Sequence, residues 1–205
     1  MHGYSIQIPQ VGTGSARLGI DSFPWQAPDA FRPKTVVALE QTGDSLLVFF
    51  RVEDQFVLAR TQEFDGPVYE DSCVEFFFTP SPEPGPYFNI EVNAAGGLKF
   101  NRQTARGVDR ISLPESVRGE INLHVSPGKI IVPEFAGPLD WEVSYEIPFA
   151  LLEHYGPVNR TEWRGNFYKC AEANSHPHFG SWAPIGTPNP DFHRPEFFGC
   201  LLLCV

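Results

Sequence analysis

The chain has 205 residues and carries 15 Lys and Arg against 25 Asp and Glu, which gives a formal net charge of −10. This charge disfavours nucleic acids and anionic membranes as partners, because both are polyanions. The apolar run at residues 197–205 is too short to span a bilayer, so no membrane insertion is expected. The 18 Phe, 20 Pro and 18 Gly, with short apolar runs between turn residues, predict an all-β fold with long loops.

The first strands are predicted by alternation and by apolar runs. Tyr4, Ile6 and Ile8 alternate with polar residues, and residues 46–52 form a strongly hydrophobic segment that fits a buried strand. Residues 73–78 and 88–92 form two further strands, which a proline-rich loop connects. We expect a single antiparallel β-sandwich domain over residues 1–205, of jelly-roll or immunoglobulin-like type.

Polar side chains alternate with apolar ones on the strand that ends at residue 93. Phe88, Ile90 and Val92 define one face, and the other face carries a phenol, two amides and a carboxylate, namely Tyr87, Asn89, Glu91 and Asn93. The apolar face is expected to be buried. The polar groups are those that bind hydroxyl-rich ligands in a shallow cleft, although a solvated strand face has the same pattern.

The second half of the chain predicts further strands and one short helix. Residues 121–125 and 129–132 form a possible hairpin, and residues 141–147 alternate between apolar and polar side chains. Residues 149–156 form a short helix that begins after Pro148 and ends at Gly156. Residues 166–172 and 198–205 supply the last strands. The long loop at 174–197 is rich in Pro, His and aromatic residues, which indicates a functional loop.

The cysteines and the N-terminus bear on the compartment. The spacing of Cys73, Cys170, Cys200 and Cys204 matches neither a zinc motif nor a disulfide scaffold, so we expect four reduced core residues. Residues 1–10 show no signal-peptide pattern, which favours the cytoplasm. An extracellular or periplasmic location is compatible with a leader that has been removed.

The order of several short segments resembles a known family. The segments VED, YEDSCVEFFF, YFNIEVN, WEVSYEIPF, GNFYKCAE, SWAPI and FHRPEFFGCLLL, from Leu46 to the C-terminus, resemble the carbohydrate-binding modules of family 9 and their DOMON-like relatives. The resemblance implies a β-sandwich that recognises a sugar or oligosaccharide on a concave sheet face, without catalysis and in connection with polysaccharide breakdown. In sugar-binding members, two tryptophans clamp a sugar unit at a chain end.

The resemblance also implies site residues. Glu75, Asn89, Glu91 and Lys169 fall on positions that bind sugar hydroxyls, while Tyr69 and Phe192 fall on the two clamp positions. Both clamp residues differ from the family tryptophans, so the sugar and its linkage stay open. Either ring still offers a flat apolar face for stacking. Trp182 is a further candidate, either as a stacking platform or as an anchor for the long loop.

Two other functions compete with sugar binding. Glu75 and Glu91 have the chemistry of the general acid and the nucleophile or base of a glycoside hydrolase. Replacement of both clamp tryptophans is also compatible with an interaction domain that has lost sugar binding. The sequence does not indicate an oligomeric state.

Metal and haem sites are less well defined. His176, His178 and His193 with Asp191 offer metal ligands without a recognised spacing. Some relatives imply structural calcium, for which Asp54, Glu70 and Asp71 are candidate ligands. A Met and His haem site, as in some DOMON-like relatives, is not expected, because Met1 is the one methionine of the chain.

Overall fold

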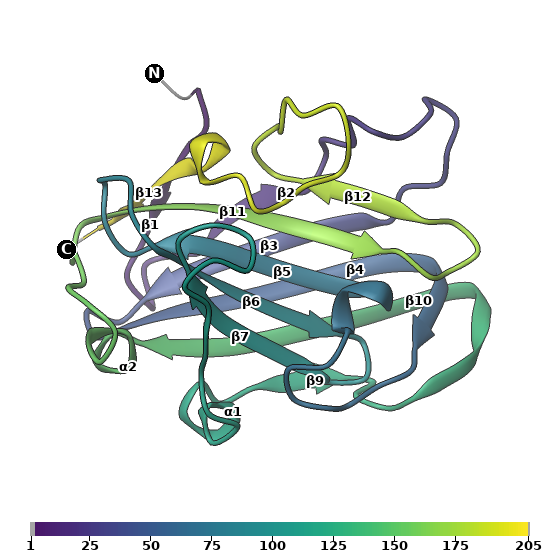
Figure 1. Cartoon of the computed structure of the whole chain (residues 1–205), viewed down its shortest axis with the longest axis horizontal. Helices are drawn as coiled ribbons and strands as arrows, with labels where there is room; N and C mark the ends of the chain where they lie inside the picture. Colours follow the sequence, from purple (N-terminus) through teal and green to yellow (C-terminus); the bar gives the residue numbers. More distant parts are fainter. Residues whose placement is uncertain (1–2, 205) are drawn as a thin grey trace.

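The computed structural model describes residues 3–204, which form two packed β-sheets (Figure 1). The first sheet has eight strands in the order β1, β13, β11, β5, β6, β7 and β8, with β12 also paired to β11. Their bounds are Ser5–Ile8 (β1), Cys73–Thr79 (β5), Tyr87–Asn93 (β6), Leu98–Gln103 (β7), Ile111–Ser112 (β8), Glu162–Ala171 (β11), His178–Ser181 (β12) and Gly199–Leu203 (β13). All of its pairs are antiparallel except β1 with β13.

The second sheet has five strands in the order β2, β3, β4, β10 and β9. Their bounds are Ala16–Gly19 (β2), Lys34–Gln41 (β3), Ser45–Ala59 (β4), His124–Ser126 (β9) and Ile131–Pro148 (β10). The hairpin predicted around residues 126–128 is wrong, because β9 pairs with residues 142–144 near the far end of β10. The first half of β10 extends the long antiparallel pair with β4 instead.

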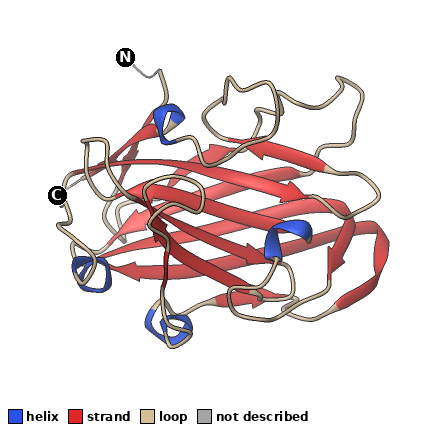
Figure 2. Cartoon of the chain, in the orientation of Figure 1, coloured by secondary structure: helices blue, strands red, loops and turns tan. Residues whose placement is uncertain are grey.

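Helices make up little of the described chain (Figure 2). The helix expected after Pro148 is confirmed as α2 (Phe149–Glu153). A second short helix, α1 (Val117–Glu120), and two 3₁₀ turns, η1 (Val68–Glu70) and η2 (Pro195–Phe197), were not predicted. Within residues 3–204, no helix has the length and apolar character needed to cross a membrane. The all-β sandwich predicted from composition and alternation is confirmed.

The main core lies between the two sheets. Phe88, Ile90 and Val92 point into it from β6, as the alternation predicted, and each is at most 3% exposed. From β10, the core receives Trp141, Val143, Tyr145 and Ile147. Phe76 of β5 stacks on Phe167 of β11 with ring centroids 4.3 Å apart. The period-two pattern of these strands therefore supplies one continuous apolar layer.

The outer face of the first sheet is also buried, which a half-solvated strand pattern would not produce. Every residue of β5 and β6 is buried. A second apolar cluster covers this face and includes Phe77, Tyr87, Tyr168, Ile185 and Phe192. The segment at 182–198, which leads from β12 to β13, contributes part of it and passes over the sheet (Figure 1). Polar residues on this face are thus enclosed by loops.

Candidate ligand-binding cleft

A cleft of about 470 Å³ opens on the outer face of the first sheet. Its walls come from η1, from the loop after β7, from β12 and from the segment before η2. Its floor consists of Glu75 on β5, Asn89 and Glu91 on β6, and Asn101 and Gln103 on β7. This volume lies within the usual range of small-molecule sites.

The floor is ordered by strand register. Glu75 lies directly opposite Glu91, which lies opposite Lys99 of β7. Asn89 lies opposite Asn101 in the neighbouring row. Since side chains at alternate positions share a face, each strand contributes residues two apart. Three of the predicted hydroxyl-binding residues, Glu75, Asn89 and Glu91, are thereby brought together.

A chain of hydrogen bonds holds part of the floor in place. Gln103 Nε2 donates to Asn89 Oδ1 at 2.8 Å, and Asn89 Nδ2 donates to Glu91 Oε1 at 2.8 Å. Gln103 Nε2 also lies 3.3 Å from His193 Nδ1, which lies 2.8 Å from the Tyr87 hydroxyl. An amide NH₂ only donates, so Nδ1 accepts and the proton of a neutral His193 sits on Nε2. The floor is therefore pre-organised before any ligand arrives.

Two polar groups of the cleft have hydrogen-bonding capacity left over. Asn101 Oδ1 is buried and has no hydrogen-bond partner among the described residues. The Lys99 ammonium makes neither a hydrogen bond nor an ion pair with any residue described, and it lies 5.2 Å from the centre of the Tyr69 ring. A buried acceptor without a donor is unfavourable by roughly 1–3 kcal/mol. A ligand hydroxyl that donates to Asn101 would remove this penalty.

Both floor carboxyls are harder to ionise than ordinary glutamates. Burial raises the pKa of Glu91 to about 7, although the positive charge of Lys99 acts in the opposite direction. Burial, together with the neighbouring Cys170 and Glu91, raises the pKa of Glu75 well above its usual value. Glu75 Oε1 accepts a hydrogen bond from Cys170 Sγ at 3.1 Å. The floor can therefore both donate and accept hydrogen bonds near neutral pH.

The aromatic residues that line the cleft agree only in part with the two predicted clamp residues, Tyr69 and Phe192. Tyr69, on η1, is half-buried and lines the cleft as expected. Phe192, at the second predicted clamp position, also lines the cleft, but its ring is only 7% exposed and stacks on Tyr168 with centroids 4.2 Å apart. Phe179 of β12 is the more exposed ring on that side. One face of Phe192 is thus already occupied by the protein.

Lys169 lies outside the cleft, on the opposite face of the sheet. It is fully buried, with Nζ 3.6 Å from Asp54 Oδ2 and 2.7 Å from His178 Nε2. Its position on β11 places it opposite Val74, whereas Tyr168 lies opposite Glu75. Alternation along the strand therefore excludes Lys169 from the floor, and its predicted role in sugar binding is corrected to a buried ion pair.

Trp182 also lies apart from the cleft. Its ring packs edge-on against Phe167 and Tyr4, with centroids 6.1 and 5.8 Å away. A Cβ at Gly199 would lie 2.5 Å from the Trp182 ring, so glycine permits this close approach. Trp182 therefore anchors the segment after β12 to the sandwich, which is the second of the two roles considered for it.

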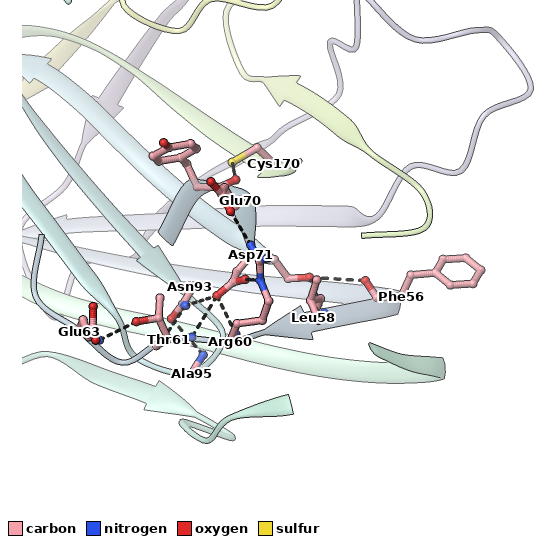
Figure 3. Close-up of polar contacts among 12 residues, drawn as sticks. Phe56, Leu58, Arg60, Thr61, Glu63, Glu70, Asp71, Asn93, Ala95 and Cys170 are labelled. Carbon is pink, nitrogen blue, oxygen red and sulfur yellow. Dashed lines mark hydrogen bonds and ion pairs between the residues drawn. The ribbon is translucent and has the colours of Figure 1, made fainter. Parts of the chain in front are cut away.

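A network around Asp71 positions the turn that carries Tyr69 (Figure 3). Asp71 accepts hydrogen bonds from the backbone and side chain of Arg60 and from Asn93 Nδ2, each at 2.8 Å. Arg60 also pairs with Glu70 at 2.7 Å. Asp71 and Glu70 thus already accept hydrogen bonds from N–H groups, and Asp54 forms an ion pair elsewhere, with Lys169. Asp54, Glu70 and Asp71 do not meet as one group of ligand atoms among the described residues, and calcium binding stays a prediction.

The candidate metal-binding histidines do not converge either. His178 contacts Lys169, His193 contacts Tyr87, and His176 stacks on Phe56 at 3.7 Å. Within the described residues, one group of three potential metal ligands has its ligand atoms close together. It consists of Cys73, Glu75 and Cys170. All four cysteines are free, as expected, but Cys200 and Cys204 are only half-buried.

Several cleft residues were missed by sequence reasoning. Lys99, Asn101 and Gln103 alternate with Leu98 and Phe100, so the same period-two pattern could have identified them. Phe179, Arg106 and Asp191 come from β12 and two loops, where no periodicity exists. Arg106 and Asp191 form an ion pair of 3.0 Å at the rim.

Comparisons with known proteins agree on one family. The profile of carbohydrate-binding family 9 matches residues 13–203. A crystal structure of a candidate carbohydrate-binding protein from Bacteroides uniformis is similar, with 28% identity and a TM-score of 0.86 over 98% of this chain and 99% of that chain. No curated protein matches the chain.

Two more distant structures share the fold. Both are of a family 9 module from Caldicellulosiruptor kristjanssonii. The complex with glucose has 13% identity and a TM-score of 0.54 over 98% of this chain and 95% of that chain. The complex with cellotriose has 14% identity and a TM-score of 0.51 over 97% of this chain and 93% of that chain.

The buried position of Lys169 predicts a role in stability. Lys169→Met leaves the Asp54 carboxylate buried without its cation, so we expect the free energy of unfolding to fall by about 3–5 kcal/mol. Urea unfolding measures this change. Lys34→Met is the matched control, because the Lys34 to Glu53 pair is exposed and should contribute about 1 kcal/mol or less. Equal small effects of the two variants would contradict a buried pair.

His193 predicts a pH dependence of stability. Burial and the nearby Arg106 lower the pKa of His193 to about 4, against 6.5 for an ordinary histidine. As pH falls, His193 therefore binds a proton in the unfolded chain before it does so in the folded protein. The free energy of unfolding should decrease as pH falls from about 6.5 to 4. His193→Gln should weaken this loss in pH-dependent urea unfolding, whereas His124→Gln at an exposed histidine should not. Identical profiles for all three proteins would refute the assignment.

Proposed function

The chain belongs to carbohydrate-binding family 9, and from this we propose that the cleft on its first sheet binds a sugar ring without chemically changing it. The observation that carries the proposal is the buried Asn101 Oδ1 on the cleft floor, which accepts no hydrogen bond from any residue that the structure describes. It lies beside Asn89 and Glu91, whose side chains are already held by hydrogen bonds. A ligand hydroxyl supplies the donor that this floor lacks.

The chemistry of the lining suits a neutral, hydroxyl-rich ring. Carboxyl and amide oxygens of Glu91, Asn89 and Asn101 accept hydrogen bonds from hydroxyls, and the Lys99 ammonium donates one. Tyr69 and Phe179 present apolar ring surfaces to the C–H groups of a sugar. Burial of the floor strengthens each polar contact, because water does not compete for it.

The placement of the two acids favours binding over hydrolysis. Glu75 and Glu91 are direct neighbours on adjacent strands and project from the same face of one sheet. A glycosidase needs its two carboxyl groups on either side of the bond that is cleaved. Two acids on one floor approach a ring from the same side, so their expected role is to hold hydroxyls.

The structures of similar proteins suggest the first ligands to test. The family 9 module from Caldicellulosiruptor kristjanssonii was solved with glucose and with cellotriose. We therefore propose glucose and short β-linked glucose chains as initial ligands for this protein.

The test is calorimetric titration with glucose, cellotriose and a wider panel of oligosaccharides, combined with an assay for released sugars. We expect saturable binding without hydrolysis. Glu91→Gln should weaken binding by about 1–3 kcal/mol, because it alters a buried hydrogen-bonding carboxyl. Glu83→Gln, at an exposed loop position outside the cleft, is the control and should not change affinity. Hydrolysis that disappears in Glu91→Gln would identify an enzyme, and absence of any binding would favour an interaction domain.

The aromatic walls give a second prediction. Phe179→Ala should weaken sugar binding with a modest loss of stability, because its ring is partly exposed to the cleft. Phe192→Ala should lower the free energy of unfolding by about 3–5 kcal/mol, since its ring is packed against Tyr168. Thermal unfolding and calorimetry on both variants separate the two effects. A stable Phe192→Ala variant that no longer binds sugar would restore Phe192 as the platform.

A further inference from the structure

Three side chains with metal-binding chemistry meet at one end of the cleft floor. They are Cys73, Glu75 and Cys170, and each is buried. One ligand atom from each, either a sulfur or a carboxylate oxygen, lies within 4.8 Å of the other two. Among the residues that the structure describes, this set shares Glu75 with the cleft floor but contains none of the candidate calcium acids or histidines considered above.

Strand pairing fixes the relative positions of the three residues. Cys73 of β5 lies directly opposite Cys170 of β11, so both thiols leave neighbouring backbones on the same face. Glu75 is two residues along β5 from Cys73 and shares that face. Cys170 Sγ already lies 3.1 Å from Glu75 Oε1. Rigid strands, rather than loops, therefore hold the ligand atoms together.

We propose that Cys73, Glu75 and Cys170 form a binding site for a thiophilic divalent cation of the Zn²⁺ class, with a fourth coordination position open to the cleft. Two sulfurs and one carboxylate oxygen match the ligand preference of Zn²⁺. In a tetrahedral site with Zn–S of about 2.3 Å and Zn–O of about 2.0–2.2 Å, ligand atoms lie about 3.5–3.8 Å apart. The separations within the cluster, from 3.1 Å between Cys170 Sγ and Glu75 Oε1 to at most 4.8 Å, lie on either side of these values.

The cleft gives the site both an entrance and a use for its fourth position. Glu75 and Cys170 line the cleft, whereas Cys73 is fully buried and does not line it. A cation that enters from the cleft would meet these two ligands first and Cys73 last. Three protein ligands with one open position are typical of zinc sites that hold a water molecule or a substrate oxygen. This proposal does not depend on the nature of the sugar, or on whether a sugar binds.

The charge balance of the site is consistent with a divalent cation. Burial raises the pKa of the Cys73 thiol to about 11 and that of Cys170 well above its usual value, so both thiols are protonated in the free protein. Binding of M²⁺ forms two S–M bonds and one O–M bond, and the displaced protons pass to solvent. Two thiolates and a carboxylate with M²⁺ leave one negative charge. The Lys169 ammonium on the opposite face of the sheet favours the thiolates and partly offsets that charge.

The experiment uses Co²⁺ and Zn²⁺ on the full chain, treated with a chelator, desalted and kept reduced with a non-thiol reductant. We expect Co²⁺ to bind once per chain and to give a thiolate-to-cobalt charge-transfer band, which Zn²⁺ then abolishes by displacement. Cys73→Ser and Cys170→Ser should each lose the band, and Glu75→Gln should weaken Co²⁺ binding. Circular dichroism checks that each variant is folded.

The matched control is the double variant Cys200→Ser, Cys204→Ser, which leaves the buried cluster intact. It should keep the charge-transfer band and the stoichiometry of the parent. Absence of the band in the parent and in this control would overturn the proposal, even if the core cysteine variants fail to fold. A band that survives in a folded Cys73→Ser, Cys170→Ser protein would overturn it too. The titrations contain no sugar, and calorimetry with sugar in the presence of a chelator tests the proposed function separately.

Discussion

The enclosure of the first sheet on both faces is the constraint on which the rest of the structure depends. A sheet with one solvated face can place polar side chains there freely, because water satisfies them. Here β5 and β6 are buried along their whole length. Each polar group on the outer face therefore needs a hydrogen-bond partner from the protein, from ordered water or from a ligand. The side chains from His193 to Glu91 bond to one another, whereas Asn101 Oδ1 has no partner among the described residues and can accept a bond from a ligand.

The two faces of the sheet separate two kinds of buried charge. On the inner face, Lys169 pairs with Asp54 and contacts His178, so its ammonium is compensated within the core. On the outer face, Glu75 and Glu91 form no ion pair with any residue in the described part of the chain, and burial raises the pKa of each carboxyl. The inner group therefore contributes to stability, whereas the outer groups keep the capacity to bind something else. Along β11, one residue separates Lys169 on the inner face from Cys170, which contacts Glu75 on the outer face.

The cleft is supported by structure that does not itself touch a ligand. Asp71 binds Arg60 and Asn93 and so holds the turn that presents Tyr69. Trp182 fixes the segment after β12, and Tyr168 supports the ring of Phe192 from behind. The same enclosure that makes the floor suitable for hydroxyls also brings Cys73 and Cys170 beside Glu75. A family 9 fold thus carries, in this chain, a floor whose chemistry combines oxygen and sulfur ligands.

The sequence by itself determined the sandwich and much of the cleft floor. Alternation identified Phe88, Ile90 and Val92 as core residues and placed Asn89 and Glu91 on the other face, because side-chain direction in a strand has period two. The order of short segments indicated the family and the place of Tyr69. Alternation along β11 also puts Lys169 on the face of Trp163 and Phe167, but only the tertiary structure showed that Asp54 and His178 contact its ammonium there. Only the tertiary structure showed that the ring of Phe179 is more exposed than that of Phe192, because residues of β12 and the following loop are positioned by long-range packing and not by a local repeat.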